Sequence, residues 1–550
     1  MHYCSIVSFL KHFVSVRRLF VCSLKGDSRS CIKGIITMTT LNSSSLAFVR
    51  LSELIELHAS ECPPKKAIIF GQEEIDYEQL HDSVLKIASA LEQAKIARGS
   101  VIAIVSNTSV SSLLAFLGVV TAGCVVAPIA PSGSVEQIEA MIEDCAAPIV
   151  FIDSFVKDRL SIKKGVQVVE LELLEDWINI WPEDLDYVAP SVKSGDTFNI
   201  IYSSGTTGTP KGIVQTHGMR WRQIAGYAIA EFRDAVTLVA TPLYSNTTLV
   251  SLLPTLAYGG TVVLMEKFDA RTFLKEAERT CATHTMLVPI QYQRIMSLTD
   301  FGNFNLDSFR FKSCTSAPFS AELKRDVVNR WPGILMEVYG MTEGGGTCLL
   351  FANEFPEKLH TVGRPAPGHD IRVIDENGKE CAKGVVGEVV GRSNIMMQGY
   401  HGRADTTEAA LWTDSHGDIF IRHGDLGRFD EDGFLTLHGR SKDMIISGGF
   451  NIYPPDIESI IRQHPDVEDC AVIGVPSDVW GETPFAFFVL KSRVIESLSL
   501  IEWVNSKVGK TQRLSGGEVI DELPISPIGK VLKRALRERY TTRVISSKGV

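Results

Sequence analysis

The sequence predicts an α/β fold in which helices flank sheets of parallel strands, followed by a smaller α+β unit. From residue 66 onward, short β-branched and apolar runs alternate with segments of helical periodicity, as in strand–helix–strand units. After Arg440 the order of elements changes, and the remaining chain of about 110 residues has a normal domain size. In the larger, N-terminal part of the chain, the runs expected to form strands are KAIIF (66–70), VIAIV (101–105), CVVAP (124–128), PIVFI (148–152), FNIIY (198–202), VTLVA (236–240), TVVLM (261–265) and HTMLV (284–288).

Residues 99–135 contain no charged side chain, and 111–130 would be long enough to cross a bilayer. The same stretch is also explained by a strand at 100–106, a helix from Ser109 to Ala122 and a strand at 124–128. A unit of this kind that is buried on both faces has the same composition, and Gly123 is a typical helix stop. We therefore expect sheet core here and no integral membrane span.

Turn signals indicate antiparallel strands between 370 and 440. ENG (376–378) and EDG (431–433) each interrupt apolar runs and are typical of hairpins. Beyond Arg440 the pattern predicts a smaller unit. Its expected elements are a helix at 454–465, strands at 468–476 and 485–490, and a helix near 497–508.

Composition excludes several classes of protein. The 550 residues are 45% hydrophobic and 22% charged, which is ordinary for a globular chain. The net charge of −10 argues against a surface that binds nucleic acid throughout. The 11 cysteines are irregularly spaced and form no C-x-x-C pair, so we expect reduced, mostly buried thiols in a reducing compartment.

Residues 1–37 differ from the rest of the chain. They carry six Lys and Arg against a single Asp, a net charge of +5, which leaves −15 for the remainder. A basic head that contains serine is compatible with a mitochondrial transit peptide. The alternative is an upstream extension of the reading frame, with the natural start at Met38. We favour the second interpretation, expect 1–37 to be disordered or mis-started, and expect a cytoplasmic protein.

A loop of small hydroxyl residues and glycines follows the strand that ends near Tyr202. Glycines allow close approach of the backbone to a ligand and present N–H groups to anions, and Lys211 adds a positive charge. The spacing is not that of a Walker A loop, because Lys211 lies between proline and glycine. This loop alone leaves phosphate binding and an ordinary flexible loop equally open. Its candidate residues are Ser203, Ser204, Gly205, Thr206, Thr207, Gly208 and Lys211.

Four further motifs follow this loop in a fixed order. They are EVYGMTE (337–343), GDL (424–426), GRSKDMIISGGFNIYP (439–454) and ISPIGKV (525–531). Together with the loop they resemble the adenylate-forming (AMP-binding) superfamily over about 50–540. The MIISGGFNIYPPDIE segment is similar to the acyl- and aryl-CoA synthetase branch, which includes fatty-acid, 4-chlorobenzoate and 4-coumarate–CoA ligases.

The resemblance implies an organisation and an activity. It implies an AMP- and acyl-binding domain at 38–440 with a small β-barrel-like subdomain, and a mobile cap at 441–550. The implied enzyme is an AMP-forming ligase that activates a carboxylic acid with ATP and Mg²⁺ and then forms a thioester with coenzyme A. Two alternatives stay open: transfer to the phosphopantetheine of a carrier protein, and an inactive nucleotide-binding relative.

The resemblance also implies roles for individual residues. The 203–212 loop would hold the ATP phosphates, and Lys442 would be the hinge. Each of the other residues also has a structural alternative, such as a core tyrosine, a turn aspartate or a solvated lysine. The implied roles are adenine stacking for Tyr339, α-phosphate binding for Thr342, Mg²⁺ binding for Glu343, ribose binding for Asp425 and Arg440, a pantetheine channel at Gly448 and Gly449, and a bridge between carboxylate and α-phosphate for Lys530.

A substrate pocket is implied at three segments. The segment 242–248 has no acidic residue, which disfavours an amino acid substrate. Side chains at 315–316 replace a glycine pair usual in relatives and would shorten the pocket, and Met341 suggests a substrate larger than acetate. We expect a medium- or long-chain fatty acid or an aryl acid. The pocket candidates are Tyr244, Ser245, Asn246, Thr315, Ser316, Ala317 and Gly340.

Overall fold

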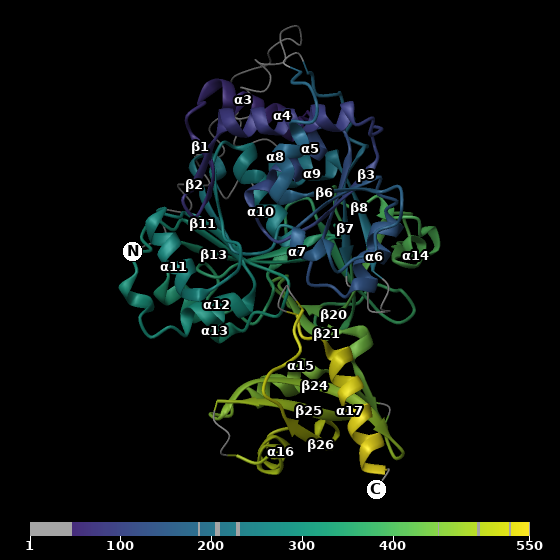
Figure 1. The fold of residues 1–550 in the computed structure, drawn as a ribbon. Coiled ribbons are helices and arrows are strands. Elements are labelled where there is room, and N and C mark those ends of the chain that lie inside the picture. Colours follow the sequence, from purple (N-terminus) through teal and green to yellow (C-terminus); the bar gives the residue numbers. More distant parts are fainter. Residues whose placement is uncertain are drawn as a thin grey trace.

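A computed structural model describes residues 47–184, 187–203, 210–226, 231–448, 450–491, 495–526 and 530–548. It has a large body that contains three sheets and a smaller C-terminal domain below it (Figure 1). The predictions for residues 1–37, for the loop residues Ser204 to Gly208 and for Gly449 lie outside the described residues.

The first large sheet has seven strands, and its centre is parallel as predicted. β7 leads into the candidate phosphate loop, and β8 returns from it antiparallel to β7. Because both strands belong to one sheet, the two ends of the loop lie side by side. The strand order is β18 (Gly399–Tyr400), β8 (Lys211–Thr216), β7 (Thr197–Ser203), β4 (Val125–Ile129), β3 (Val101–Val105), β5 (Ile149–Ile152) and β6 (Gln167–Glu170).

The second large sheet has nine strands. It is parallel from β13 to β1 and antiparallel at its two edges. The expected strands are confirmed to within one or two residues. The order is β15 (Arg364–Pro365), β14 (Thr347–Phe351), β13 (Ile334–Gly340), β12 (Phe311–Cys314), β11 (His284–Leu287), β9 (Val236–Val239), β10 (Thr261–Leu264), β1 (Lys66–Phe70) and β2 (Glu73–Asp76).

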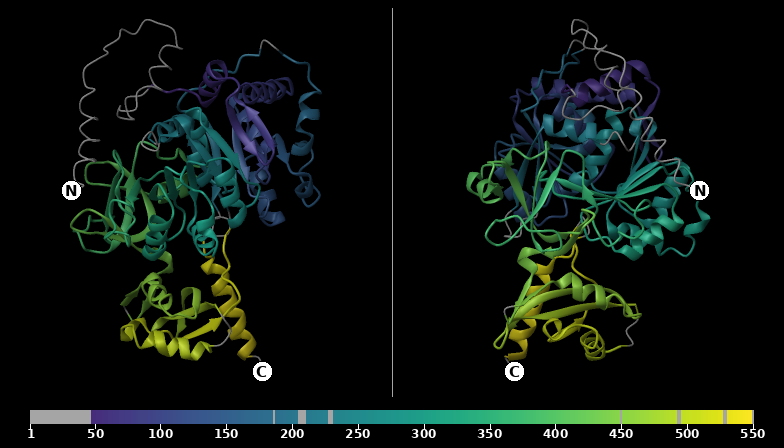
Figure 2. Two further views of the ribbon diagram at one scale, coloured as in Figure 1. Left: turned by 90° about the vertical axis from the view of Figure 1, so that its left-hand side faces the viewer. Right: turned by 180° about the vertical axis from the view of Figure 1, so that it is seen from behind.

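Helices cover the two large sheets (Figures 1 and 2). Several of them begin at a side-chain cap; for example, Asp76 Oδ1 accepts from Gln79 N at the start of α4 over 2.9 Å. The helices are α3 (Leu51–Glu61), α4 (Tyr77–Gln93), α5 (Val110–Thr121), α6 (Val135–Asp144), α7 (Ser154–Lys157), α8 (Leu174–Ile178), α9 (His217–Gly226), α10 (Asn246–Ala257), α11 (Ala270–Arg279), α12 (Pro289–Met296), α13 (Ala321–Arg330) and α14 (Ala404–Ala409).

The uncharged stretch at 99–135 is the β3–α5–β4 unit, as expected. α5 packs so closely on α4 that a Cβ at Gly118 would lie 2.4 Å from Ile87 Cγ2. Only glycine fits there, which explains a glycine inside a helix. Within the described part of the chain, no helix is both long and apolar enough to span a membrane. Eight described cysteines are free thiols, and five of them are buried.

A third, curled sheet is antiparallel throughout and lies between the large sheets and the C-terminal domain (Figure 1). The EDG turn joins β20 to β21, as predicted. The ENG turn gives only an isolated bridge between Ile374 and Glu380, because β16 pairs instead with β17 farther along the chain. The strands are β16 (Asp370–Ile374), β17 (Gly387–Arg392), β19 (Leu411–Thr413), β20 (Ile419–Phe429) and β21 (Leu435–Arg440).

The C-terminal domain begins after β21 with the 3-10 turn η6 (Ser441–Asp443). Its strands and helices include those expected, together with β22, β23, β26 and α17, which the sequence analysis did not anticipate. The predicted boundary at 440/441 falls between two sheets, and the mobility of the cap stays a prediction. The elements are β22 (Ile445–Ser447), β23 (Phe450–Ile452), α15 (Pro454–Ile461), β24 (Val467–Ser477), β25 (Gly481–Leu490), α16 (Ser497–Asn505), β26 (Gly516–Val519) and α17 (Lys533–Lys548).

A buried ion pair ties α13 to β13. Lys324 and Glu337 are 2% and 6% exposed, and the Lys324 amine also donates to the carbonyls of Leu359 and Thr361. Burial raises the pKa of Glu337, which the positive charge of Lys324 opposes. The pair therefore depends on both partners.

We expect Lys324→Met to cost about 3–5 kcal/mol of unfolding free energy, because it leaves a buried carboxylate without its partner. Since the pKa of Glu337 is raised, its charged form is the costly one, so the loss should grow as pH rises and shrink in acid. Urea unfolding across pH measures both effects. The double variant with Glu337→Leu should recover most of the loss. Equal stability of Lys324→Met and wild type at pH 8 would contradict this account.

Candidate active site

The candidate residues meet where the curled sheet adjoins the large sheets and the C-terminal domain. The end of β13 carries Tyr339 and Gly340, and the chain continues directly to Thr342 and Glu343. β20 and β21 lie at the waist between body and C-terminal domain (Figures 1 and 2). The site is therefore assembled from segments that are far apart in sequence.

Asp425 is the centre of one group of contacts. Tyr339 Oη donates to Asp425 Oδ2 over 2.8 Å, and Arg440 Nε donates to Asp425 Oδ1 over 2.8 Å. Asp425 and Arg440 are register partners on β20 and β21. Both carboxylate oxygens are thus oriented, with further lone pairs available to a ligand hydroxyl. Burial, and then the charge of Asp425, raise the pKa of Tyr339, so its hydroxyl stays protonated.

His423 supports Tyr339 and was missed by the sequence analysis. Its Nε2 lies 2.7 Å from Gly345 O, and its Nδ1 lies 3.0 Å from Tyr339 Oη. Because a carbonyl only accepts, the ring proton lies on Nε2 and Nδ1 is an acceptor, so the single hydroxyl proton of Tyr339 is donated either to Asp425 Oδ2 or to Nδ1, and not to both at once. Burial lowers the pKa of His423, which favours this neutral form. Its position two residues before Asp425 was the available signal.

Glu343 forms a second group with Tyr400, which the sequence analysis also missed. Tyr400 Oη donates to Glu343 Oε1 over 2.9 Å, and Met397 N donates to Glu343 O over 2.7 Å. The Lys211 amine lies 5.3 Å from the centre of the Tyr400 ring. Lys211, which follows the phosphate loop, and Glu343, which follows β13, therefore both lie beside Tyr400. Ser203, at the near end of that loop, pairs with Lys211 in register.

Lys530 approaches these residues from the C-terminal domain. Removal from water lowers the pKa of its amine, and the positive charge of Arg440 lowers it further, while Asp425 and Glu343 act in the opposite direction. The residue as a whole keeps exposed surface. Burial also lowers the pKa of Lys442 in η6. The structure thus brings Lys530 to Arg440, Asp425, Glu343 and Lys442.

Gly448 lies apart from this group. Its N–H donates to Trp480 O over 2.8 Å, its φ is +55°, and a Cβ built there would lie 2.7 Å from Trp480 Cε3. The three atoms nearest to that Cβ all belong to Trp480, whose side chain is 54% exposed. The structure therefore places this glycine against an exposed tryptophan of the C-terminal domain.

The pocket candidates come together at the start of α10 and the end of β12. Ser245 caps α10 by accepting from Thr247 N over 3.2 Å, and Thr247 Oγ1 lies 2.8 Å from Ser316 Oγ. Thr315 Oγ1 donates to Val338 O over 2.7 Å. The two added hydroxyl side chains are thus engaged with protein atoms. Tyr244, Asn246 and Ala317 are partly buried beside these residues in sequence, and Gly340 is exposed.

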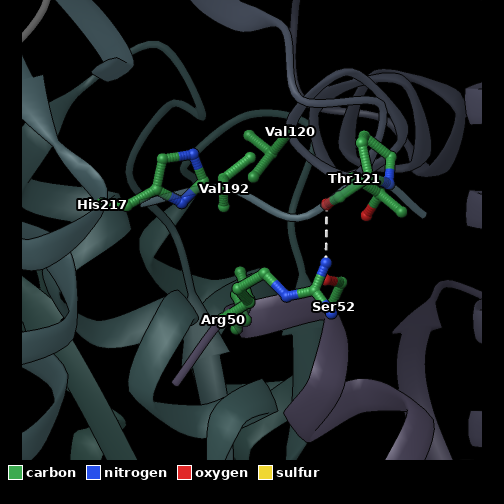
Figure 3. A pocket seen from close by; sticks show the side chains of 8 residues that line it. Arg50, Ser52, Val120, Thr121, Val192 and His217 are labelled. Atoms are coloured by element: carbon green, nitrogen blue, oxygen red, sulfur yellow. Dashed lines mark hydrogen bonds between the residues drawn. The ribbon is translucent and has the colours of Figure 1, made fainter. Parts of the chain in front are cut away.

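A small cavity between α3 and α5 is a different feature (Figure 3). Its lining includes Arg50 and His217 and none of the candidate site residues. Arg50 Nη1 donates to Pro190 O over 2.7 Å, the bond that the dashed line marks. This arginine fastens the segment around Pro190 to the start of α3.

Comparison with known sequences agrees with the motifs. The profile of the family described as "AMP-binding enzyme" matches residues 55–401, and that of the "AMP-binding enzyme C-terminal domain" matches 456–530. The chain is 30% identical to indoleacetate–CoA ligase of Aromatoleum aromaticum over 516 residues, covering 89% of this chain and 98% of the relative. It is 29% identical to the long-chain-fatty-acid–CoA ligase FadD13 of Mycobacterium tuberculosis, with 85% and 93% covered.

Solved structures agree as well. ATP-bound MatB from Rhodopseudomonas palustris has a TM-score of 0.80 at 28% identity, covering 90% of this chain and 99% of that one. The o-succinylbenzoate–CoA synthetase MenE of Bacillus subtilis, in complex with its acyl-adenylate, has a TM-score of 0.79 at 25% identity, with 90% and 99% covered. The expected α/β architecture and the resemblance read from the ordered motifs are both confirmed: this chain belongs to the AMP-binding enzyme family of adenylate-forming enzymes.

Proposed function

We propose that this protein is an AMP-forming acid–CoA ligase of the cytoplasm. In the first step a carboxylate oxygen attacks the α-phosphorus of ATP and pyrophosphate leaves, giving an acyl-adenylate. In the second step the thiol of coenzyme A attacks the acyl carbon and AMP leaves. The observation that supports this most directly is the position of Lys530, which brings one cation of the C-terminal domain to Glu343, Asp425 and Arg440 of the large body.

The residues suit the first step electrostatically. A carboxylate and a polyphosphate are both anions, so their approach requires nearby positive charge. Lys530, Arg440 and Lys211 supply it from three different elements. Asp425 would accept the ribose hydroxyls, and Tyr339 would present its ring to the adenine. The oriented Asp425 carboxylate needs no rearrangement to do so, because Tyr339 and Arg440 already hold it.

Glu343 suits a magnesium ligand. Mg²⁺ prefers hard oxygen donors and is usually held by one or two carboxylates together with substrate phosphates. Glu343 is a single carboxylate, and the group that holds its Oε1 is the neutral hydroxyl of Tyr400, so its negative charge is not consumed by an ion pair. When bound with ATP, the ion would offset the charge of the phosphates. Thr342, the neighbour of Glu343, would then bind the α-phosphate.

The second step would use the opposite face of the C-terminal domain. We place the hinge at Lys442 and the pantetheine channel at Gly448 and Gly449. The support is that Lys442 lies in η6, the turn that follows β21, and that Gly448 packs against the exposed Trp480. A rotation about η6 would exchange the two faces. Water must be kept from the acyl-adenylate between the steps, which favours such a closed domain.

The substrate we propose is a medium- or long-chain fatty acid or an aryl acid. Relatives at 29–30% identity include enzymes named for indoleacetate, ferulate and long-chain fatty acids, so they support both types. The candidate pocket segment 242–248 lacks an acidic residue that would hold a substrate ammonium group.

A pyrophosphate-release screen over short, medium, long and aryl acids tests this function. We expect release with one class of acid, and a CoA thioester only when coenzyme A is added. Faster acylation of a holo-carrier protein than of free coenzyme A would instead favour a carrier-protein ligase. Absence of turnover across the panel, with ATP binding retained in calorimetry, would indicate a nucleotide-binding relative without catalysis.

A further inference from the structure

Three buried polar side chains form a cluster beside β7 and β8, the two strands that flank the candidate phosphate loop in sequence. Asn199 lies on β7, Gln215 on β8 and Arg220 on α9, and their exposed fractions are 0%, 0% and 2%. Asn199 and Gln215 are register partners, so they flank the loop on the strands that lead into it and out of it. The cluster is therefore built into the frame that supports the loop.

The contacts within the cluster fix the orientation of one amide. Asn199 Nδ2 donates to Gln215 Oε1 over 3.0 Å, and Arg220 Nη2 donates to the same oxygen. Arg220 Nε donates to Asn199 Oδ1 over 2.9 Å. Because a guanidinium only donates, the Gln215 amide cannot flip without placing its NH₂ against another donor. Its NH₂ must point the other way.

The Gln215 NH₂ group points toward the segment Thr342–Glu343, which carries the candidate α-phosphate and Mg²⁺ ligands. Gln215 Nε2 donates to Thr342 O over 2.8 Å. Gln215 belongs to the seven-stranded sheet, whereas Thr342 follows β13 of the nine-stranded sheet. This hydrogen bond thus crosses between two sheets, and it joins the strand after the phosphate loop to the residue before Glu343. Both segments would have to face the same triphosphate.

The charge of Arg220 is unusual for a buried residue. Among the described residues its hydrogen-bond partners are neutral amides and no carboxylate pairs with it, and the Phe198 ring lies 5.9 Å from its Cζ. Burial lowers the pKa of Arg220 to about 9. An unpaired buried charge costs stability, and an apolar side chain of similar volume often packs as well or better. Packing alone therefore does not account for an arginine here.

We propose that Asn199, Gln215 and Arg220 form a positioning device for adenylation, in which Arg220 orients the Gln215 amide and that amide holds the Thr342–Glu343 segment in place relative to β7 and β8, the strands on either side of the phosphate loop. Gln215 and Arg220 are positioning residues, because they act through Thr342 rather than on the substrate. The inference rests on the proposed function, since it assigns to the segment the task of meeting ATP.

Gln215→Glu is the sharpest test. The carboxylate still accepts from Asn199 and Arg220 and pairs with the buried charge, but it has no N–H to donate to Thr342 O. We expect unchanged or higher thermal stability together with a roughly 10- to 100-fold lower kcat for pyrophosphate release, the size of effect that a small misplacement of reacting groups produces. The KM for the acid should change little. A variant as active as wild type would overturn the proposal.

Gln223→Glu is the matched control. Gln223 Oε1 accepts from Arg220 Nη1 over 2.8 Å, so this change adds the same charge beside the same guanidinium. Among the described residues its side chain bonds to Arg220 and not to the Thr342–Glu343 segment, so adenylation should stay within about threefold of wild type. Equal losses in the two variants would mean that the added charge, and not the bond to Thr342, is responsible, and would overturn the assignment.

Arg220→Met keeps the proposal testable should Gln215→Glu fail to fold. It removes the costly charge and frees the Gln215 amide, so stability should be retained while adenylation falls roughly 10-fold or more. Wild-type adenylation in this variant would overturn the proposal. Calorimetric titration with Mg·ATP tests the position of the Thr342–Glu343 segment without turnover. The Gln215→Glu variant should bind Mg·ATP more weakly than the Gln223→Glu variant. A wild-type protein that activates no acid would contradict the proposed function, whereas an active wild type with unaffected variants contradicts this inference alone.

Discussion

Lys530→Ala is expected to lower acyl-adenylate formation roughly 100- to 1,000-fold, the effect of removing one preorganised group that stabilises developing charge. The reason is electrostatic: the amine of Lys530, which belongs to the C-terminal domain, is near enough for its pKa to respond to the charges of Glu343, Asp425 and Arg440. Thioester formation from synthetic acyl-adenylate and coenzyme A should be nearly unaffected, because that step does not create the phosphorus–oxygen bond. Pyrophosphate release measures the first step, and thioester formation from the synthetic adenylate measures the second.

Lys510→Ala is a suitable control for Lys530→Ala, because Lys510 is an exposed lysine of the same domain, on the 3-10 turn at 510–512. It should leave both half-reactions unchanged. Equal loss of both steps in Lys530→Ala would show that the lysine holds the fold or the domain arrangement rather than the reacting groups. Lys530→Arg should not restore full activity, since a planar guanidinium and a compact ammonium do not replace each other at one position.

Glu343→Gln is expected to have an effect of similar size, again roughly 100- to 1,000-fold on pyrophosphate release. The amide keeps the volume of the side chain and an oxygen that accepts from Tyr400 Oη, so the local fold is preserved. It removes the negative charge that we assign to Mg²⁺ binding. The half-saturating Mg²⁺ concentration should therefore rise along with the loss of rate, and a titration of rate against Mg²⁺ measures both.

Tyr400→Phe distinguishes the role of the Glu343 charge from that of the hydrogen bond that Tyr400 donates to it. It removes the hydroxyl that donates to Glu343 but leaves the charge, so the loss should be smaller than in Glu343→Gln, on the order of 10-fold, the lower end of what one hydrogen bond to a charged group contributes. An unchanged Mg²⁺ requirement in Glu343→Gln would rule out the metal role of Glu343. A larger loss in Tyr400→Phe than in Glu343→Gln would shift that assignment toward the tyrosine.

Local features of the fold were predictable from the sequence because their causes are local. The helix at 110–121 is bounded by Ser109, which caps it, and by Gly123, whose φ of +71° ends it. The EDG turn at 431–433 was likewise predictable, because it joins the neighbouring strands β20 and β21. The ENG turn shows the limit: the turn forms, but its downstream strand is chosen by pairing in the sheet. Turn chemistry fixes a reversal of the chain, not the partner of the next strand.

The site residues also differ in whether the sequence could predict them, for the same reason. Tyr339, Asp425, Arg440 and Lys530 lie in motifs whose order is readable, and the structure brings them together. The contact of Gln215 with Thr342 joins residues 127 positions apart. Which of many buried amides meets which carbonyl depends on how two sheets pack, and no sequence period encodes that. His423 and Tyr400 were missed for the same reason, although each lies near a motif.

The register pairing of Asp425 with Arg440 has a consequence for how such an enzyme changes over time. Arg440 is the last residue of β21, and the proposed hinge, Lys442, lies two positions later in η6. The strand that would hold the nucleotide is thus also the strand from which the C-terminal domain hangs. Nucleotide affinity and domain swing are therefore not separate traits that selection can adjust independently. A substitution along β21 that changes one of these properties would also change the other. Compensating substitutions should therefore arise near Asp443 and Arg537, whose ion pair of 2.7 Å lies beside the proposed hinge.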